Sequence, residues 1–165
     1  MMIEASQGLR VLGINILARF LVNKENNIRF IALKCLDQVV NVDYKAVEKH
    51  KTTIVGCIKD ADVTIKKKAL DLVYRICKTT NIKSIVKELL NHLLSADKKF
   101  KEELSNKVLM AVEKYSPSKK WQLDTVIKVF TLAGSIVMDN FVNSLIALIV
   151  STPELQNYAV NKVYF

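Results

Sequence analysis

The sequence predicts an all-α protein whose helices stack in pairs as a solenoid. Apolar residues recur at helical spacing along nearly the whole chain, and Gly (four) and Pro (two) are scarce. A short pattern also returns four times: a polar residue that starts a helix, an apolar residue, a basic residue, two variable positions, a small or apolar residue and an apolar residue. Its apolar position falls at Ile28, at Ile65, more loosely at Phe100, and finally at Leu155. The first three copies are 37 and 35 residues apart, the period of stacked helical hairpins. We therefore expect a right-handed α-α superhelix, a HEAT/armadillo-like solenoid, of about nine helices.

Four helices are expected in the first half, at residues 4–22, 27–40, 45–58 and 63–78. The first is apolar on nearly every side between residues 9 and 17, so it should be buried from more than one direction. In the third, Val47, His50, Ile54 and Ile58 share one face. Because the first helix lacks the polar outer face of a terminal repeat, we expect the chain to be an interior piece of a longer solenoid. The uncapped pattern at residues 163–165 points the same way.

The second half predicts helices at residues 82–94, 98–115, 117–133 and 139–150, with a ninth starting at Thr152 and Pro153. Pro117 suits the first position of the seventh helix, and Gly134 suits its end. The third and fourth copies of the pattern lie 55 residues apart. This longer spacing predicts an inserted helix, so the repeat that holds it should have three helices, as in an armadillo unit.

The repeated positions have physical reasons. Ala32, Ala69 and Ala159 place a small side chain where the second helix of each pair approaches its partner. Helix-capping side chains are expected at Asp62, Asp97 and Thr152. The basic position is unfavourable, because the dipole at a helix N-terminus disfavours a cation. We therefore predict that Arg29 and Lys66 point at turn carboxylates, namely Glu25, Asp60 or Asp62.

Length and hydropathy favour a single domain over residues 1–165. Half of the residues are apolar, enough for a core, and the mean hydropathy is +0.17. The longest uncharged runs, 129–138 and 140–153, are too short to span a membrane. The first residues do not resemble a signal peptide. The surplus apolar surface is therefore expected to face protein.

No catalytic or metal-binding constellation is predicted. Cys35, Cys57 and Cys77 lie in apolar stretches without metal-ligand spacing, so buried thiols are expected. His50 and His92 are 42 residues apart, too isolated for a histidine-centred triad, and a structural role is expected for both. Phosphate-loop, nucleophile-elbow and zinc-protease motifs are missing from the sequence. We therefore predict a protein that is not an enzyme and that needs no cofactor.

The net charge of +9 offers a second candidate for function. Helix starts and turns carry lysine clusters that would merge into a basic ridge if they shared one edge of the solenoid. Such a ridge would attract anionic lipid headgroups or nucleic acid, although no aromatic-interleaved surface favours nucleic acid. The alternative is that these lysines keep an apolar solenoid in solution. The candidate contacts are Lys66, Lys67, Lys68, Lys98, Lys99, Lys119 and Lys120.

Three stretches carry a more specific resemblance. Residues 8–21 with 27–33 resemble the large-subunit trunk of clathrin adaptor complexes, the adaptins. Residues 50–66 and 113–125 resemble the gamma type of the trans-Golgi and endosomal complex, although the alpha type shares parts of the last stretch. The resemblance covers almost the whole chain.

The resemblance implies a non-enzymatic scaffold for vesicle-mediated protein transport. Such a subunit pairs with a second large, a medium and a small subunit, and its complex works with clathrin, an Arf-family GTPase and cargo. It implies a cytoplasmic protein held peripherally on trans-Golgi and endosomal membranes and on coated vesicles. No binding residue of the family is transferred, because those sites lie mainly outside the matching stretches. A free-standing basic HEAT-repeat module that binds anionic lipid or RNA remains the alternative.

Overall fold

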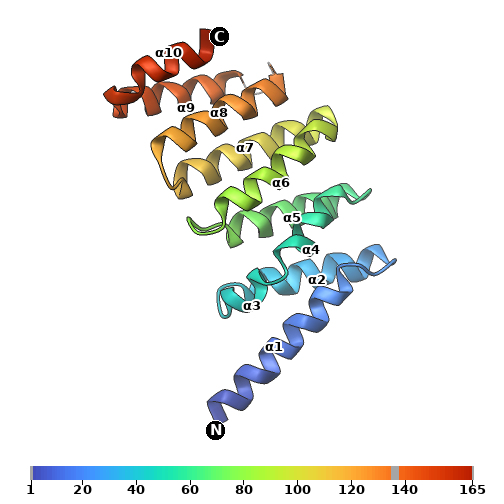
Figure 1. Ribbon diagram of the computed structural model, residues 1–165. Helices are drawn as coiled ribbons and strands as arrows, with labels where there is room; N and C mark the ends of the chain where they lie inside the picture. The colour runs from blue at the N-terminus through green and yellow to red at the C-terminus, as the bar shows by residue number, and fades with distance from the viewer. Residues whose placement is uncertain (1, 135–137, 165) are drawn as a thin grey trace. The chain divides into compact units, whose positions relative to one another are not determined.

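The computed structural model describes residues 2–134 and 138–164, and these ranges contain ten α-helices and no strand (Figure 1). The prediction of an all-α helical solenoid is confirmed. The chain divides into two compact units, Met1–Ile76 and Cys77–Phe165. The helix count exceeds the expected nine because one expected helix is broken in two.

The first unit contains α1 (Met2–Phe20), α2 (Asn26–Val39), α3 (Tyr44–Glu48), α4 (Lys51–Gly56), the 3₁₀ turn η1 (Cys57–Lys59) and α5 (Val63–Ile76). Its main contact joins α2 to α5, the two helices that carry the first two copies of the pattern. Their small positions, Ala32 and Ala69, are at most 1% exposed. The largest fully buried side chains of this unit are Ile14, Leu33, Leu36, Ile54, Ile65, Leu70, Leu72 and Ile76.

The prediction of one continuous helix over residues 45–58 is wrong. The backbone of His50 (φ −97°, ψ 14°) leaves the helical region, so α3 ends at Glu48 and α4 starts at Lys51. His50 is half-buried, and its Nε2 lies 2.9 Å from Asn15 Oδ1 on α1. It therefore links α4 to α1 instead of extending the core face. Val47 and Ile54 remain buried on either side of the break.

The second unit contains α6 (Ile82–Ser95), α7 (Lys98–Tyr115), α8 (Lys119–Ala133), α9 (Met138–Ser151), the 3₁₀ turn η3 (Pro153–Leu155) and α10 (Gln156–Tyr164). The inserted helix, α8, packs against α6 and α7 and also against α9. Contact with both members of the preceding pair is the arrangement expected for a three-helix repeat. A small cluster of Leu123, Leu148 and Ala159 joins α8 and α9 to α10.

Helix starts follow the predicted chemistry in two of three cases. Asp62 Oδ1 accepts from Thr64 N at 2.7 Å, and Asp97 Oδ1 accepts from Phe100 N at 3.0 Å, so both caps are confirmed. Thr152 was expected to do the same and does not. A 3₁₀ turn follows it, and the N–H of Leu155 bonds to the Thr152 carbonyl at 3.0 Å. Thr152 Oγ1 is buried and has no hydrogen-bond partner among the residues that the structure describes.

The two turns around α8 show one correction and one confirmation. Pro117 is not the first helical residue, because Ser118 caps the helix by accepting from Trp121 N at 3.3 Å, and α8 starts at Lys119. Pro117 therefore lies in the turn before the cap. Gly134 ends the helix as predicted. Its φ of +69° is a left-handed conformation that side chains with a Cβ rarely adopt.

Candidate functional site

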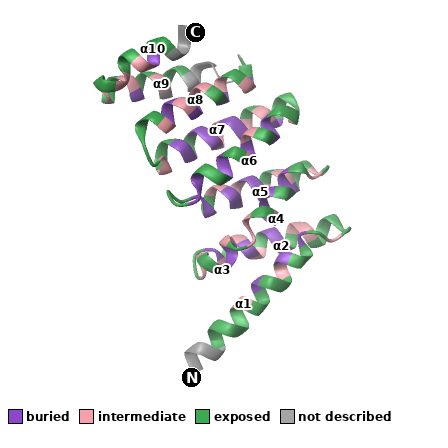
Figure 2. Ribbon diagram, in the orientation of Figure 1, coloured by how far each residue is buried: buried purple, intermediate pink, exposed green. Residues whose placement is uncertain are grey.

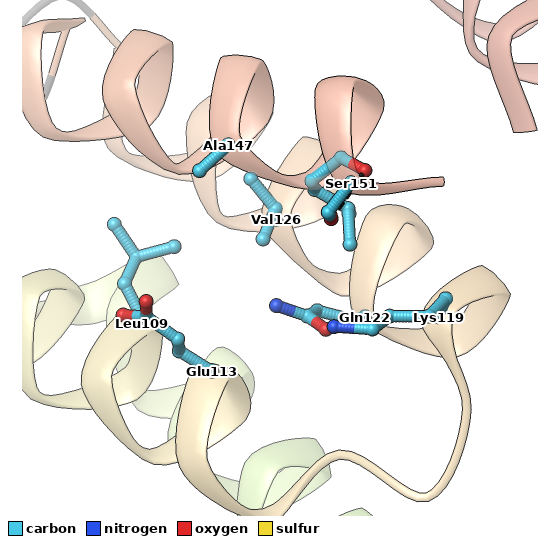
Figure 3. Close-up of a pocket in the computed structure, with 8 residues that line it drawn as sticks. Leu109, Glu113, Lys119, Gln122, Val126, Ala147 and Ser151 are labelled. Carbon is cyan, nitrogen blue, oxygen red and sulfur yellow. Dashed lines mark hydrogen bonds between the residues drawn. The ribbon is translucent and has the colours of Figure 1, made fainter. Parts of the chain in front are cut away.

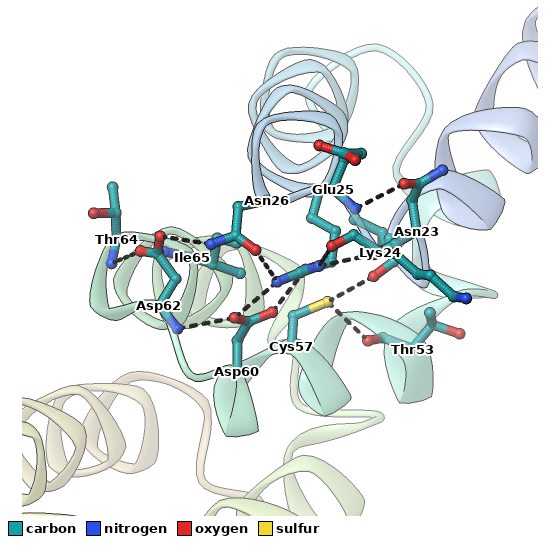
Figure 4. Close-up of polar contacts among 12 residues, drawn as sticks. Asn23, Lys24, Glu25, Asn26, Thr53, Cys57, Asp60, Asp62, Thr64 and Ile65 are labelled. Atoms are coloured by element: carbon teal, nitrogen blue, oxygen red, sulfur yellow. Dashed lines mark hydrogen bonds and ion pairs between the residues drawn. The ribbon is translucent and has the colours of Figure 1, made fainter.

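Arg29 is the centre of a polar network in the first unit, and its partners Asn23, Lys24 and Asp60 are labelled in Figure 4. Its Nε donates to Asp60 Oδ2 at 2.8 Å and its second terminal nitrogen donates to Asp60 Oδ1 at 3.0 Å. The other terminal nitrogen donates to the carbonyls of Asn23 and Lys24 at 2.8 and 3.0 Å. One guanidinium therefore ties the α1–α2 turn to the turn that follows η1.

This network confirms the prediction for Arg29, since Asp60 was one of the named carboxylates. The prediction for Lys66 stays a prediction. Lys101, at the same position in the third copy, does something different: its Nζ donates to the Leu132 carbonyl at 3.2 Å. That carbonyl lies near the C-terminus of α8, where the helix dipole favours a cation. The basic residue of the first copy thus contacts a carboxylate just after η1, whereas that of the third copy contacts a carbonyl near the end of α8.

Asp37 on α2 binds two cations of α5. Lys68 Nζ lies 2.8 Å from Asp37 Oδ2, and Arg75 contacts Asp37 Oδ1 and Asn41 Oδ1. Partial burial raises the pKa of Asp37, but hydrogen bonds and charges from Lys68 and Arg75 outweigh this and hold the pKa below its usual value of 3.8. Lys68, a predicted anionic-surface contact, is therefore part of an internal ion pair.

The predicted lysine contacts do not gather on one edge of the second unit. Lys98 and Lys99 are exposed at the start of α7, at the same end of the hairpin as Leu132. Lys119 and Lys120 are exposed at the start of α8, beside the end of α7 (Figure 1). Lys120 also lies 4.7 Å from the centroid of the Tyr158 ring. In the first unit, Lys66, Lys67 and Lys68 follow each other on the first turns of α5.

The exposed apolar surface is concentrated on helix faces. On α1, Ile14 and Ala18 are buried, whereas Leu9 (72% exposed), Leu12 (55%) and Ile16 (42%) face outward (Figure 2). The expected burial of this helix from several directions is therefore not met within the chain. On α9, Val142, Ile146 and Val150 recur at spacing of four and are likewise exposed. Such stripes are the usual mark of a surface that another protein covers.

A pocket of about 160 Å³ lies among α7, α8 and α9 (Figure 3). It is lined by Leu109, Glu113, Lys119, Gln122, Val126, Ala147, Leu148 and Ser151. Gln122 is only 6% exposed, and its Oε1 accepts from Ser116 Oγ at 3.2 Å. The pocket thus combines a buried carboxamide with two charged side chains of opposite sign.

The cysteines and histidines form no visible reaction centre. Burial raises the pKa of the Cys57 thiol to about 11 and that of Cys77 to about 12, which keeps both protonated at neutral pH. Cys35 is only half-buried, contrary to expectation, and His92 is buried within α6. Across residues 2–134 and 138–164, the acidic, histidine and cysteine side chains form no group of three or more that could hold a metal.

Sequence reasoning missed several structural residues. Asp37, Arg75, Gln122 and Tyr158 were not singled out, although Tyr158 Oη donates to Asp124 Oδ1 at 2.9 Å and joins α10 to α8. Asp37 and Lys68 lie 31 residues apart, as do Arg29 and Asp60. The same separation between oppositely charged residues was the signal in the sequence from which these two ion pairs could have been predicted. Within the described ranges, no helix combines the length and hydropathy that crossing a membrane requires.

Comparisons with known proteins agree with the resemblance. The family model described as the adaptin N terminal region matches residues 1–164. Over 99% of its own length, the chain is 52% identical to the AP-1 complex subunit gamma of Dictyostelium discoideum. Over the same share of the chain, it is 44% identical to AP-1 complex subunit gamma-1 of Arabidopsis thaliana. Identity to the AP-2 complex subunit alpha-1 of Arabidopsis thaliana is 31% over 98% of the chain. The chain covers 18%, 19% and 16% of these relatives, respectively.

Proposed function

Because this chain belongs to the adaptin family, we propose that it is part of the trunk of a gamma-type large subunit, a non-enzymatic scaffold in a clathrin adaptor complex. Higher identity to the gamma relatives than to the alpha relative supports the gamma type. The proposal covers residues 1–165 as one continuous solenoid segment. The protein would serve vesicle-mediated transport between the trans-Golgi network and endosomes, in the cytoplasm and peripherally on those membranes and on coated vesicles.

The observation that carries a scaffold function is the pair of exposed apolar stripes on α1 and α9. A carboxylate, amide or lysine at these positions would improve solubility, yet Leu9, Leu12, Ile146 and Val150 are each more than half exposed. Exposed apolar side chains at regular helical spacing stabilise a protein only when another surface removes them from water. Each Å² of apolar surface that is buried contributes about 25 cal/mol. Protein neighbours, meaning further helices of the trunk and the other adaptor subunits, supply such a surface.

The proposed partners are of two kinds, those of the trunk itself and those of the whole complex. The second large, the medium and the small subunit would pack directly against the assembled trunk. Clathrin, an Arf-family GTPase and cargo would be partners of the complex. The described residues supply shape and apolar surface toward this assembly, and we assign no cofactor or catalytic step to them.

The alternative, a basic module that binds anionic lipid or RNA directly, is weakened by the placement of the lysines. Lys68 is paired with Asp37, and the clusters at Lys98–Lys99 and Lys119–Lys120 lie at opposite ends of the α7–α8 hairpin. A helix of 18 residues is roughly 27 Å long, well beyond the ~8 Å Debye length at physiological salt. These two clusters would therefore act on a flat anionic surface almost independently.

Co-expression of the chain with the second large, medium and small adaptor subunits tests the proposal. Copurification that persists from 0.15 to about 0.5 M NaCl is expected, because apolar contacts are not screened. Failure to copurify, together with binding to phosphatidylserine vesicles that is lost over the same salt range, would favour the basic module instead.

A further inference from the structure

The turn that joins α7 to α8 presents a serine directly before a proline. Ser116 follows the last residue of α7, Pro117 and Ser118 are exposed, and α8 starts after them (Figure 2). Proline disfavours the helical region for the residue before it, and Ser116 accordingly has extended backbone angles (φ −60°, ψ 133°). Ser118 is extended as well (φ −155°, ψ 151°). Residues 116–118 therefore form a short extended segment at the surface of the second unit.

The hydroxyl of Ser116 is held by a single printed contact. Its Oγ donates to Gln122 Oε1 at 3.2 Å, and the residue keeps part of its surface in water. Rotation about one side-chain bond releases this hydroxyl without moving either helix. Ser118 differs, because its Oγ accepts from Trp121 N and caps α8. A reaction at Ser116 thus changes one side-chain contact, whereas a reaction at Ser118 changes the start of a helix.

The charges beside this segment favour a phosphorylated product. Lys119 and Lys120 follow it directly and are exposed, and residues 116–120 contain no acid. A phosphoserine carries a charge of about −1.5 to −2 at neutral pH. Added to Ser116, it would nearly neutralise the two lysines, close to the positive end of the α8 dipole.

The sequence holds one other hydroxyl directly before a proline, that of Thr152 before Pro153. Its Oγ1 is buried, and Leu155 stands three positions beyond it, where Ser116 has a lysine. Thr152 therefore lacks both the partly exposed hydroxyl and the following cation. The two positions form a matched comparison within one chain.

We propose that Ser116 is a phosphorylation site for a proline-directed kinase that also recognises Lys119. Kinases of this class bind an extended segment and select proline directly after the acceptor, and one group of them selects lysine or arginine three residues beyond it. Ser116 Oγ attacks the γ-phosphorus of ATP while the bond from that phosphorus to the β–γ bridging oxygen breaks. The hydroxyl proton passes to the catalytic aspartate of the kinase, and ADP leaves. This proposal does not depend on the identity of the adaptor complex.

Phosphorylation changes the α7–α8 turn in a defined way. The esterified Ser116 Oγ no longer donates, so Gln122 Oε1, on a side chain of a residue that is only 6% exposed, loses this donor. Rotation of the Gln122 carboxamide turns its amino group toward the phosphate and restores a hydrogen bond, now a charge-assisted one. The modification thus exchanges a neutral contact for a stronger one and removes the positive charge from the start of α8.

The test treats the whole chain with a purified cyclin-dependent kinase and MgATP. Intact-mass spectrometry counts the phosphates, and fragmentation of the tryptic peptide of residues 115–119 separates Ser116 from Ser118. We expect one phosphate per chain, on Ser116, and none on Thr152. The side-chain amide NMR signals of Gln122 should shift on modification, whereas those of Asn26, in the first unit, should not.

Matched variants separate the acceptor from its recognition. Ser116→Ala should abolish the phosphate, whereas Ser118→Ala should keep it. Lys119→Gln should slow the reaction roughly tenfold or more, because it removes the cation that the kinase recognises. Lys120→Gln changes the next residue and should leave the rate within about twofold of the unmodified sequence. A synthetic peptide of residues 110–124 shows how the same sequence reacts without its fold.

Three results would overturn the proposal, given a kinase that is active on a standard substrate. The first is a folded chain that stays unmodified, whether the peptide reacts, so that the fold withholds Ser116, or does not react, so that the sequence is not recognised. The second is a phosphate that persists in Ser116→Ala. The third is equal slowing by Lys119→Gln and Lys120→Gln, which would mean that the kinase does not recognise Lys119 by its position.

Discussion

Arg29 and Asp60 are joined by two parallel hydrogen bonds, 2.8 and 3.0 Å long, across 31 residues of sequence. Both side chains are mostly shielded, at 15% and 10% exposure. Asp60 also accepts from the backbone N–H of Asp62 at 2.9 Å, so the carboxylate connects directly to the start of α5. The pair holds two turns of the first unit in register.

Replacing Arg29 should therefore destabilise the first unit strongly. Arg29→Ala leaves the Asp60 carboxylate and two turn carbonyls without their donor, and we expect a loss of about 2–4 kcal/mol in the free energy of unfolding. Arg29→Lys should recover little of this, because a lysine lacks the planar fork. Urea unfolding followed by circular dichroism measures both losses. Full rescue by lysine would contradict the bidentate role.

The ion pairs of Asp37 predict a pH dependence. Its pKa is lowered in the folded state, so its contribution is complete above the usual value of 3.8 and is lost as the pH falls through the lower folded value. Wild-type stability should therefore fall more steeply than that of Asp37→Asn when the pH is lowered from 5 to 2. Parallel urea titrations at each pH measure the difference. Identical slopes would show that the carboxylate gains nothing from Lys68 and Arg75.

Two glycines should respond to alanine in opposite directions. Gly56 has ordinary helical angles (φ −56°, ψ −34°), and an added Cβ would meet nothing within 4 Å, so Gly56→Ala should stabilise by about 0.4–1 kcal/mol. Gly134, at φ +69°, cannot accept a Cβ without strain, and Gly134→Ala should cost about 1 kcal/mol or more. Thermal unfolding of the two variants compares them directly. Destabilisation by Gly56→Ala would contradict the helical backbone and the open space around this position.

The apolar face of α1 predicts self-association of the isolated chain. Leu9, Leu12 and Ile16 form one exposed stripe, and copies of the chain in solution can cover it for each other. Leu12→Glu should shift the sedimentation profile toward the monomer, whereas Lys24→Glu, a surface charge change in the turn after α1, should not. A wild-type chain that remains monomeric at about 100 μM would contradict this reading of the stripe.

Periodicity was enough to predict the helices because each buries a regular stripe. The expected bounds of α7 agree with the structure, and those of α2, α5 and α6 differ by at most two residues. The break at His50 was not predictable, because it depends on a contact with Asn15, 35 residues away. The prediction that the Thr152 side chain caps a helix is wrong, because a 3₁₀ turn and not an α-helix follows Thr152.

The interaction surface was only partly predictable. Charge counting identified the lysine clusters, but it did not show that Lys68 would pair with Asp37 on another helix. The pocket was invisible to sequence reasoning, because its walls come from three helices. Such sites arise from packing geometry, which spacing along the chain does not record.

The most direct test of the scaffold account compares two variants of the chain in copurification with the other adaptor subunits. One replaces Leu12, Ile146 and Val150 with glutamate, and the other replaces Lys98, Lys99, Lys119 and Lys120 with glutamine. The account predicts that the apolar variant loses the subunits at 0.15 M NaCl while the lysine variant retains them, with circular dichroism showing equal helix content in both. Retention by the apolar variant and loss by the lysine variant would contradict it.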